Sequence, residues 1–124
     1  MNKLLALLLS LFAFALAKQE IIAYYNPGCG CCSSYFSKLE NEGFRIKKVK
    51  VSNEELDRIK NQLKVPLNIR SCHTMVYEGR FIEGHVPPKG VSLVLREKNI
   101  KGVASPHGVK SGRGGYEDNY EVVR

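Results

Sequence analysis

Hydrophobic residues at the start of the chain form one nearly unbroken run. It covers residues 4–14, follows the basic Lys3 and leads into Ala15-Leu16-Ala17. A basic start, a short apolar stretch and a small-x-small site predict a secretory signal peptide over residues 1–17 that is cleaved off. The stretch is shorter than the ~20 residues that span a bilayer, which disfavours an uncleaved anchor. We therefore expect residues 18–124 to act in the periplasm or to be secreted, with no stable membrane insertion.

The pattern then alternates between strand and helix spacing. An apolar and aromatic run at residues 21–25, closed by Asn26-Pro27-Gly28, predicts a buried strand that ends in a turn. From Cys32 or Ser33, apolar positions recur with helical spacing until Gly43, which predicts a helix with a left-handed glycine at its end. The predicted buried face consists of Cys32, Tyr35, Phe36 and Leu39.

The next segment repeats this order. Residues 44–51 predict a strand whose apolar phase changes between Ile46 and Val49, and a β-bulge would absorb that change. Ser52-Asn53-Glu54-Glu55 is a capping box and predicts the start of a second helix. The buried stripe of that helix consists of Leu56, Ile59 and Leu63.

A hairpin and a third helix are predicted in the second half of the chain. Residues 74–78 and 80–86 have strand composition and join through the tight turn Glu78-Gly79. Pro87-Pro88 is typical of a helix start. The residues that share the apolar face of this helix are Val91, Val94 and Leu95.

The order β-α-β-α-β-β-α predicts an α/β fold with a central mixed four-stranded sheet flanked by helices. Residues 102–115 are rich in glycine and predict a loop, and residues 120–123 predict a short terminal strand. We therefore expect one main domain over residues 18–101, and a loop and C-terminal tail over residues 102–124 that pack on it.

Composition and charge indicate a packed domain that does not bind nucleic acid. The chain has 124 residues, of which 44% are hydrophobic and 25% charged, so one packed domain is expected. The formal net charge is +7, but only Lys47, Lys48 and Lys50 lie close together, and no exposed aromatic residues are predicted beside them. No nucleic-acid partner is expected, because such a surface needs a basic face with stacking residues.

Three of the four cysteines lie where the first predicted strand leads into the first helix. Cys29 and Cys32 form a Cys-x-x-Cys pair, as in thioredoxin, at a helix N-terminus that stabilises a thiolate. Cys31 adds a third thiol, which a simple dithiol exchange does not need. The adjacent Cys31 and Cys32 would bind one ion together only with strain. The cluster therefore favours bridging of two or more soft ions.

Two other roles for the cysteines remain open. Four cysteines in an exported domain can form disulfides, for example between Cys29 and Cys32 and between Cys31 and Cys72, although a domain with an apolar core does not usually need them. A closed zinc site usually divides its ligands into two spaced pairs, and this cluster is not divided. Zinc is therefore the less favoured metal.

Further metal-binding residue types flank the predicted hairpin. Cys72-His73 precedes it, His85 follows it, and His107 lies in the glycine-rich loop. In the expected fold, Cys72 and His73 face the segment 29–32, so one site collects up to four thiolates and an imidazole. Such ligands suit Cu(I) and Zn(II), and copper also cycles between oxidation states. The alternatives are a hydrogen-bonded strand-end position for His85 and a surface position for His107.

These motifs make the chain similar to the CopG-type copper-resistance proteins, which are exported metal-binding proteins with a thioredoxin-like fold and a Cys-x-Cys-Cys motif. The resemblance extends from about Ile22 to Leu95. It rests on Cys29-Gly30-Cys31-Cys32, Arg70-Ser71-Cys72-His73-Thr74 and Glu83-Gly84-His85-Val86-Pro87. It implies copper as Cu(I) or Cu(II), a multinuclear thiolate-bridged cluster, possible copper oxidoreductase activity, and partnership with other periplasmic copper-handling proteins. The ligands it implies are Cys29, Cys31, Cys32, Cys72, His73 and His85.

The chain departs from the family pattern in one segment. Relatives carry methionines in the loop after the last helix, whereas this chain has Ser105-Pro106-His107-Gly108-Val109. Either His107 replaces one methionine as a ligand, which would harden the site, or this part of the coordination is lost.

The alternative hypothesis is that the protein is a periplasmic thiol-disulfide oxidoreductase. In that hypothesis Cys29 is the redox nucleophile and Cys32 is the resolving thiol. Dithiol exchange needs neither Cys31 nor Cys72-His73, whereas a copper cluster uses all of them, so the copper reading is favoured. A copper chaperone or buffer without turnover has the same sequence features as a copper oxidoreductase.

Overall fold

The structure is a computed structural model that describes residues 19–105 and 115–124. The predicted signal peptide, residues 1–17, and the candidate ligand His107 lie outside these residues. In the described part of the chain, no helix combines the length and the apolar character needed to cross a membrane.

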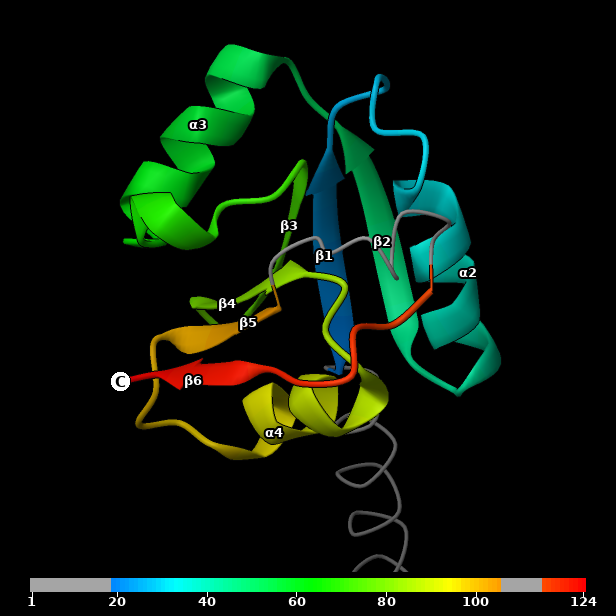
Figure 1. The fold of residues 1–124 in the computed structure, drawn as a ribbon, viewed down its shortest axis with the longest axis vertical. Helices are drawn as coiled ribbons and strands as arrows, with labels where there is room; N and C mark the ends of the chain where they lie inside the picture. The colour runs from blue at the N-terminus through cyan, green and yellow to red at the C-terminus, as the bar shows by residue number, and fades with distance from the viewer. Residues whose placement is uncertain (1–18, 106–114) are drawn as a thin grey trace, which may run out of the picture.

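A mixed sheet of six strands forms the centre of the molecule, in the order β2-β1-β3-β4-β5-β6 (Figure 1). Parallel pairs join β1 to β2 and β4 to β5, and the other neighbours are antiparallel. The strands are β1 (Glu20–Tyr25), β2 (Arg45–Lys50), β3 (His73–Tyr77), β4 (Arg80–Gly84), β5 (Gly102–Ser105) and β6 (Glu121–Val123).

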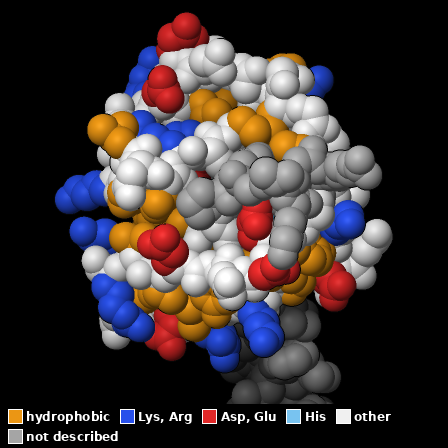
Figure 2. Space-filling view, viewed as in Figure 1, with side chains coloured by type: hydrophobic (Ala, Val, Ile, Leu, Met, Phe, Trp, Pro, Cys, Tyr) orange, Lys and Arg blue, Asp and Glu red, His pale blue; other side chains and the backbone are white. Residues whose placement is uncertain are grey.

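Helices cover both faces of the sheet. On one face, α2 (Cys32–Asn41) and α4 (Pro88–Arg96) pack against alternate residues of the strands, such as Ile21, Ala23 and Met75. On the other face, Ile69 of the short 3₁₀ helix η1 (Leu67–Ile69) and the residues after α3 (Asn53–Gln62) pack against Phe81 and Ala104. On the face shown in Figure 2, Lys and Arg side chains are interspersed with Asp and Glu.

The local sequence signals predicted the positions of α2, α3 and α4, but of the predicted buried stripe of α3 only Leu56 is fully buried, while Ile59 and Leu63 are half-buried. The buried face of α2 consists of Cys32, Tyr35, Phe36 and Leu39. The helix is followed by Gly43 at φ +101°, a conformation that favours glycine. Ser52 caps α3, because its Oγ accepts a hydrogen bond from the amide of Glu55 at 3.1 Å. The third helix begins at Pro88 and buries Val91 and Val94.

Two predictions about the sheet are wrong. The sheet has six strands where four were predicted: the segment 102–105, predicted to be loop, forms β5 beside β4, and the short terminal strand predicted over residues 120–123 joins the same sheet as β6. Gly102 lies so close to the backbone and ring of Phe81 that a Cβ atom would not fit. The predicted bulge in β2 is absent, since β1 and β2 pair residue for residue from Glu20 opposite Arg45. Ile46 and Val49 are both partly buried at this sheet edge.

Candidate metal centre

The cysteine-rich segment forms a tight turn between β1 and α2. Asn26 starts the turn: its Oδ1 accepts from the amide of Gly28 at 2.8 Å, and its carbonyl accepts from the amide of Cys29 at 3.0 Å. Cys31 is the N-cap residue of α2, and Cys32 is the first residue of the helix. The cysteines therefore lie at a helix N-terminus, where backbone amides and the helix dipole favour thiolates.

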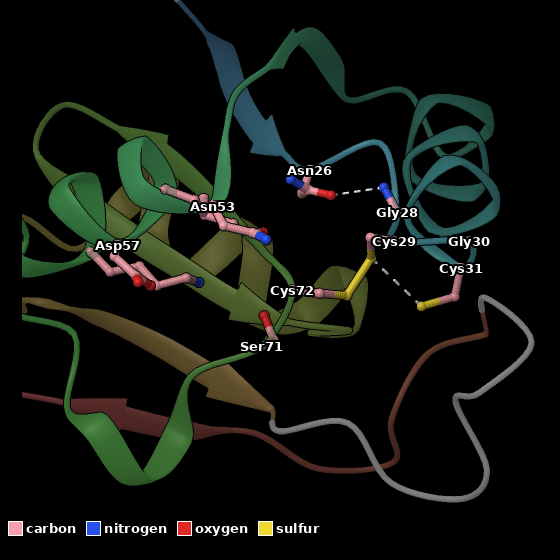
Figure 3. A pocket seen from close by; sticks show the side chains of 11 residues that line it. Asn26, Gly28, Cys29, Gly30, Cys31, Asn53, Asp57, Ser71 and Cys72 are labelled. Atoms are coloured by element: carbon pink, nitrogen blue, oxygen red, sulfur yellow. Dashed lines mark hydrogen bonds between the residues drawn. A yellow bond between two sulfur atoms is a disulfide. The ribbon is translucent and has the colours of Figure 1, made fainter.

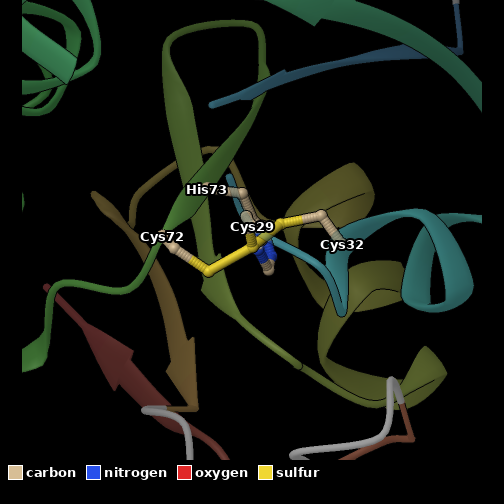
Figure 4. Close-up of side chains that lie close together, drawn as sticks. All are labelled: Cys29, Cys32, Cys72 and His73. Atoms are coloured by element: carbon tan, nitrogen blue, oxygen red, sulfur yellow. Dashed lines mark hydrogen bonds between the residues drawn. A yellow bond between two sulfur atoms is a disulfide. The ribbon is translucent and has the colours of Figure 1, made fainter. Parts of the chain in front are cut away.

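Strand pairing brings the second motif to this turn. β1 and β3 are antiparallel neighbours, and Tyr25 at the end of β1 pairs with His73 at the start of β3. The residues just after β1 and just before β3 therefore meet. One donor atom from each of Cys29, Cys32, Cys72 and His73 lies within 4.8 Å of the others (Figure 4). The structure thus brings Cys72 and His73 together with the Cys-x-x-Cys pair, as predicted from the sequence.

The sulfur atoms have two alternative pairings. The Sγ of Cys29 is at bonding distance from the Sγ atoms of both Cys32 and Cys72. A sulfur atom forms one disulfide, so these pairings exclude each other, and either one leaves the third cysteine as a thiol. The Sγ of Cys31 lies 3.9 Å from that of Cys29, so the pairing of Cys31 with Cys72, considered from sequence, is not the one this geometry favours. In the reduced state, three thiols converge and Cys31 stands beside them.

The ring of His73 is buried and held at both nitrogens. Its Nε2–H donates to the carbonyl oxygen of Gly84 at 3.1 Å, and its Nδ1 lies 3.3 Å from the Sγ of Cys32. A carbonyl can only accept, so this contact fixes the proton on Nε2 in the neutral ring. The lone pair of Nδ1 then points toward the cysteine sulfur atoms, and a metal ligand needs its lone pair in this direction. Gly84 has φ +82°, a conformation that favours glycine.

His85 is buried behind His73 and is not part of the group of four. Its ring stacks on Tyr35 with centroids 4.7 Å apart and planes 3° from parallel, and its Nδ1 lies 2.9 Å from the carbonyl oxygen of Gly115. Its ring centroid is 5.5 Å from that of His73. Tyr35 donates to the carbonyl of Val86 at 2.7 Å, and burial raises the pKa of Tyr35 well above its ordinary value. Tyr35 therefore fixes both imidazoles through ring contacts.

A buried ion pair that was not predicted from the sequence lies beside residues 71–74. Lys60 of α3 pairs with Glu83 of β4, and both side chains are almost fully buried. Burial lowers the pKa of Lys60, while the charge of Glu83 acts in the opposite direction. The sequence did hold a signal, because Lys60 follows Leu56 by four residues and so lies on the buried face of its helix.

A cleft of about 530 Å³ gives solvent access to the sulfur atoms (Figure 3). It lies between the cysteine-rich turn and α3. Cys29, Cys31 and Cys72 line one part of it, and Asp57 and Lys60 of α3 line another. An ion or a thiol ligand can therefore reach three of the four cysteines without an opening of the fold.

The chain is similar to one family model and to two solved structures. A family model described as "Protein of unknown function, DUF411" matches residues 69–113. The chain is similar to the solved structure "Copper resistance protein copG- Form 1", with 30% identity, TM-score 0.69, and coverage of 82% of this chain and 81% of that chain. For "Copper resistance protein copG- Form 2" the values are 32%, 0.69, 83% and 85%. No curated protein sequence matches the chain.

Proposed function

The chain belongs to the CopG family of copper resistance proteins, and on this basis we propose that it binds copper ions as its cargo in copper resistance or homeostasis. The observation that carries the proposal is the group formed by Cys29, Cys32, Cys72 and His73, whose donor atoms lie within 4.8 Å of one another. Thiolate and imidazole ligands suit Cu(I), and this group contains no carboxylate of the kind that Ca²⁺ or Mg²⁺ prefers.

Cys31 supports a cluster rather than a single ion. Its Sγ lies 3.9 Å from that of Cys29, and in Figure 3 the side chains of Cys31 and Cys72 approach the Cys29 sulfur from opposite sides. A bridging Cys29 thiolate would join an ion held by Cys32, Cys72 and His73 to a second ion held by Cys31. His85 and His107 are the further candidate ligands of this thiolate-bridged copper cluster.

We also propose that the site interconverts Cu(II) and Cu(I). Thiolates favour Cu(I), and imidazole binds both oxidation states. The step balances: the thiolates of Cys29 and Cys32 lose one electron each and form a disulfide, while two Cu(II) ions become two Cu(I) ions, so the Cys29-bridged cluster belongs to the reduced protein before this step. The contact between the Cys29 and Cys32 sulfur atoms supports this step.

The proposed location of the protein is outside the cytoplasm. The predicted signal peptide over residues 1–17 supports a periplasmic or secreted protein, where copper is handled outside the cytoplasm. A Cys-x-x-Cys segment at the start of α2, beside a mixed sheet, supports a thioredoxin-like description of the fold.

The test is an anaerobic competition for Cu(I) between the reduced protein, residues 18–124, and a chromogenic Cu(I) chelator. The wild type is expected to withdraw Cu(I) from the chelator, and Cys29→Ser/Cys72→Ser is expected to fail, because two of the converging donors are gone. Ser33→Ala, an exposed change next to the site, is the control and should behave as wild type. A wild-type protein that leaves all Cu(I) on the chelator would overturn the proposal.

A thiol-disulfide oxidoreductase is the second candidate. The observation in its favour is that Cys29 can pair with either Cys32 or Cys72, as a sulfur that exchanges disulfides would. Reduction of insulin disulfides by the reduced protein tests it. Activity that survives Cys31→Ser and is lost in Cys29→Ser would favour this candidate, and inactivity of the wild type would exclude it.

A further inference from the structure

We propose that the buried ion pair of Lys60 and Glu83 is a positioning device for the copper site, which holds the Cys72-His73 dipeptide in the shape that directs both of its side chains to one point. This inference rests on the proposed function, since it explains how two of the ligands are placed. Neither Lys60 nor Glu83 belongs to the group of donor atoms.

The dipeptide needs to be held because its geometry is irregular. Adjacent residues of a regular strand point to opposite faces of the sheet. Here both neighbours reach the same atom: the Sγ of Cys32 lies 3.8 Å from the Sγ of Cys72 and 3.3 Å from the Nδ1 of His73. The backbone bends at Cys72, just before β3 begins, and this bend makes the convergence possible.

The ion pair holds the bend from both sides. Before it, one carboxylate oxygen of Glu83 accepts from the backbone amide of Ser71 at 2.7 Å and from its hydroxyl at 3.0 Å. After it, the ammonium group of Lys60 donates to the carbonyl oxygen of His73 at 3.1 Å. The other carboxylate oxygen of Glu83 accepts from the hydroxyl of Thr74 at 2.7 Å. The residues on either side of Cys72 are thus tied to one charged pair.

The same glutamate is linked to the ring of His73. Glu83 is followed by Gly84, whose carbonyl oxygen accepts from Nε2 of His73. A displacement of Glu83 therefore moves both the backbone of the dipeptide and the group that sets the tautomer of its imidazole. Ser71, Thr74 and Glu83 belong to the two motifs around the hairpin, and no role as ligands accounts for them.

A fully buried ion pair is a poor source of stability, because the desolvation of two charges offsets their attraction. A well-packed apolar pair would stabilise the fold as well, but it could not donate to a carbonyl or accept from an amide. The directional hydrogen bonds to Ser71 and His73 are what this pair adds.

The experiment uses Lys60→Met, Glu83→Met and the double variant, all as the reduced protein. Each single change leaves a buried group without its partner and should lower the unfolding temperature, whereas the double variant removes both charges and should recover much of that loss. The control is Lys48→Met, which breaks the exposed ion pair of Lys48 and Glu40 at 2.9 Å and should change nothing.

Two readouts separate positioning from stability. The first is Cu(I) affinity in chelator competition, expected to fall roughly 10- to 100-fold in the double variant, as for other groups that orient metal ligands. The second is copper-free: ¹⁵N NMR of the His73 ring should show proton occupancy of Nε2 in the wild type and a mixture of tautomers in the double variant.

A double variant with wild-type Cu(I) affinity and an unchanged His73 tautomer would overturn the inference and leave the ion pair a structural role only. If the wild type itself fails to bind Cu(I), the proposed function fails, and the tautomer measurement still decides whether the ion pair orients His73. Failure of the inference and failure of the function are therefore distinct results.

Discussion

Gly84→Ala tests the arrangement of His73 without touching a ligand. Gly84 has φ +82°, and its carbonyl oxygen accepts the hydrogen bond from Nε2 of His73 at 3.1 Å. Alanine disfavours this conformation, so the backbone is expected to relax and turn the carbonyl away. The ring of His73 then loses the partner that holds its proton on Nε2.

The size of the effect follows from two contributions. Holding a non-glycine residue at positive φ costs about 1–3 kcal/mol. Leaving the buried Nε2–H of His73 without an acceptor costs about 1–3 kcal/mol more. Gly79→Ala is the matched control, because Gly79 has φ +77° in the exposed hairpin turn, with open space for a Cβ atom. Gly79→Ala therefore carries the cost of the positive φ but not the cost of the unpaired Nε2–H of His73.

Urea denaturation of the reduced, metal-free proteins measures both variants. Gly84→Ala is expected to lose about 1–3 kcal/mol more than Gly79→Ala, which is the cost of the orphaned donor. Cu(I) affinity should fall roughly 10- to 100-fold in Gly84→Ala only. Equal losses of stability in the two variants, with equal Cu(I) affinity, would refute the assignment of Nδ1 of His73 as the ligand atom.

Three further predictions concern the fold that carries the site. Tyr35→Phe removes the hydrogen bond to the carbonyl of Val86 and should cost about 1 kcal/mol at neutral pH. Burial raises the folded-state pKa of Tyr35 above its ordinary 10.0, so the stability that this residue contributes is present below pH 10 and is lost as the pH rises beyond it. Above pH 10, the stability of the wild type should therefore fall more steeply than that of Tyr35→Phe, which thermal melts measure. Gly102→Ala should lower stability by about 1–3 kcal/mol, because a Cβ atom collides with Phe81, whereas an unaffected melting curve would mean that β5 does not pack against β4 as described. Ser52→Ala should cost about 1 kcal/mol in denaturation experiments through loss of the cap of α3, and no loss would show that the Glu55 amide does not depend on this cap.

The sequence predicted the elements whose signals are local. The helical spacing of Cys32, Tyr35, Phe36 and Leu39 and the glycine after them defined α2. The capping box at Ser52 defined the start of α3. The meeting of the two cysteine motifs could also be predicted, because a strand order alone places the start of β3 opposite the end of β1.

Features that depend on distant partners escaped prediction. Residues 102–105 read as a loop because glycine is rare in strands, yet Gly102 is required there by its close approach to Phe81. Lys60 has a charged side chain, and only its partner in β4 explains its burial. The position of His85 behind Tyr35 depends on ring stacking between a helix and a loop, which no spacing in the sequence encodes.

The most direct test of a thiolate copper site is X-ray absorption of the Cu(I)-loaded protein, measured for the wild type and Cys31→Ser. The wild type should show copper surrounded mainly by sulfur, with a nitrogen contribution from His73 and a short copper-to-copper distance. In Cys31→Ser the copper-to-copper signal and at least one bound equivalent should be lost, while sulfur ligation by the remaining cysteines persists. Copper surrounded only by nitrogen and oxygen in the wild type would contradict the account.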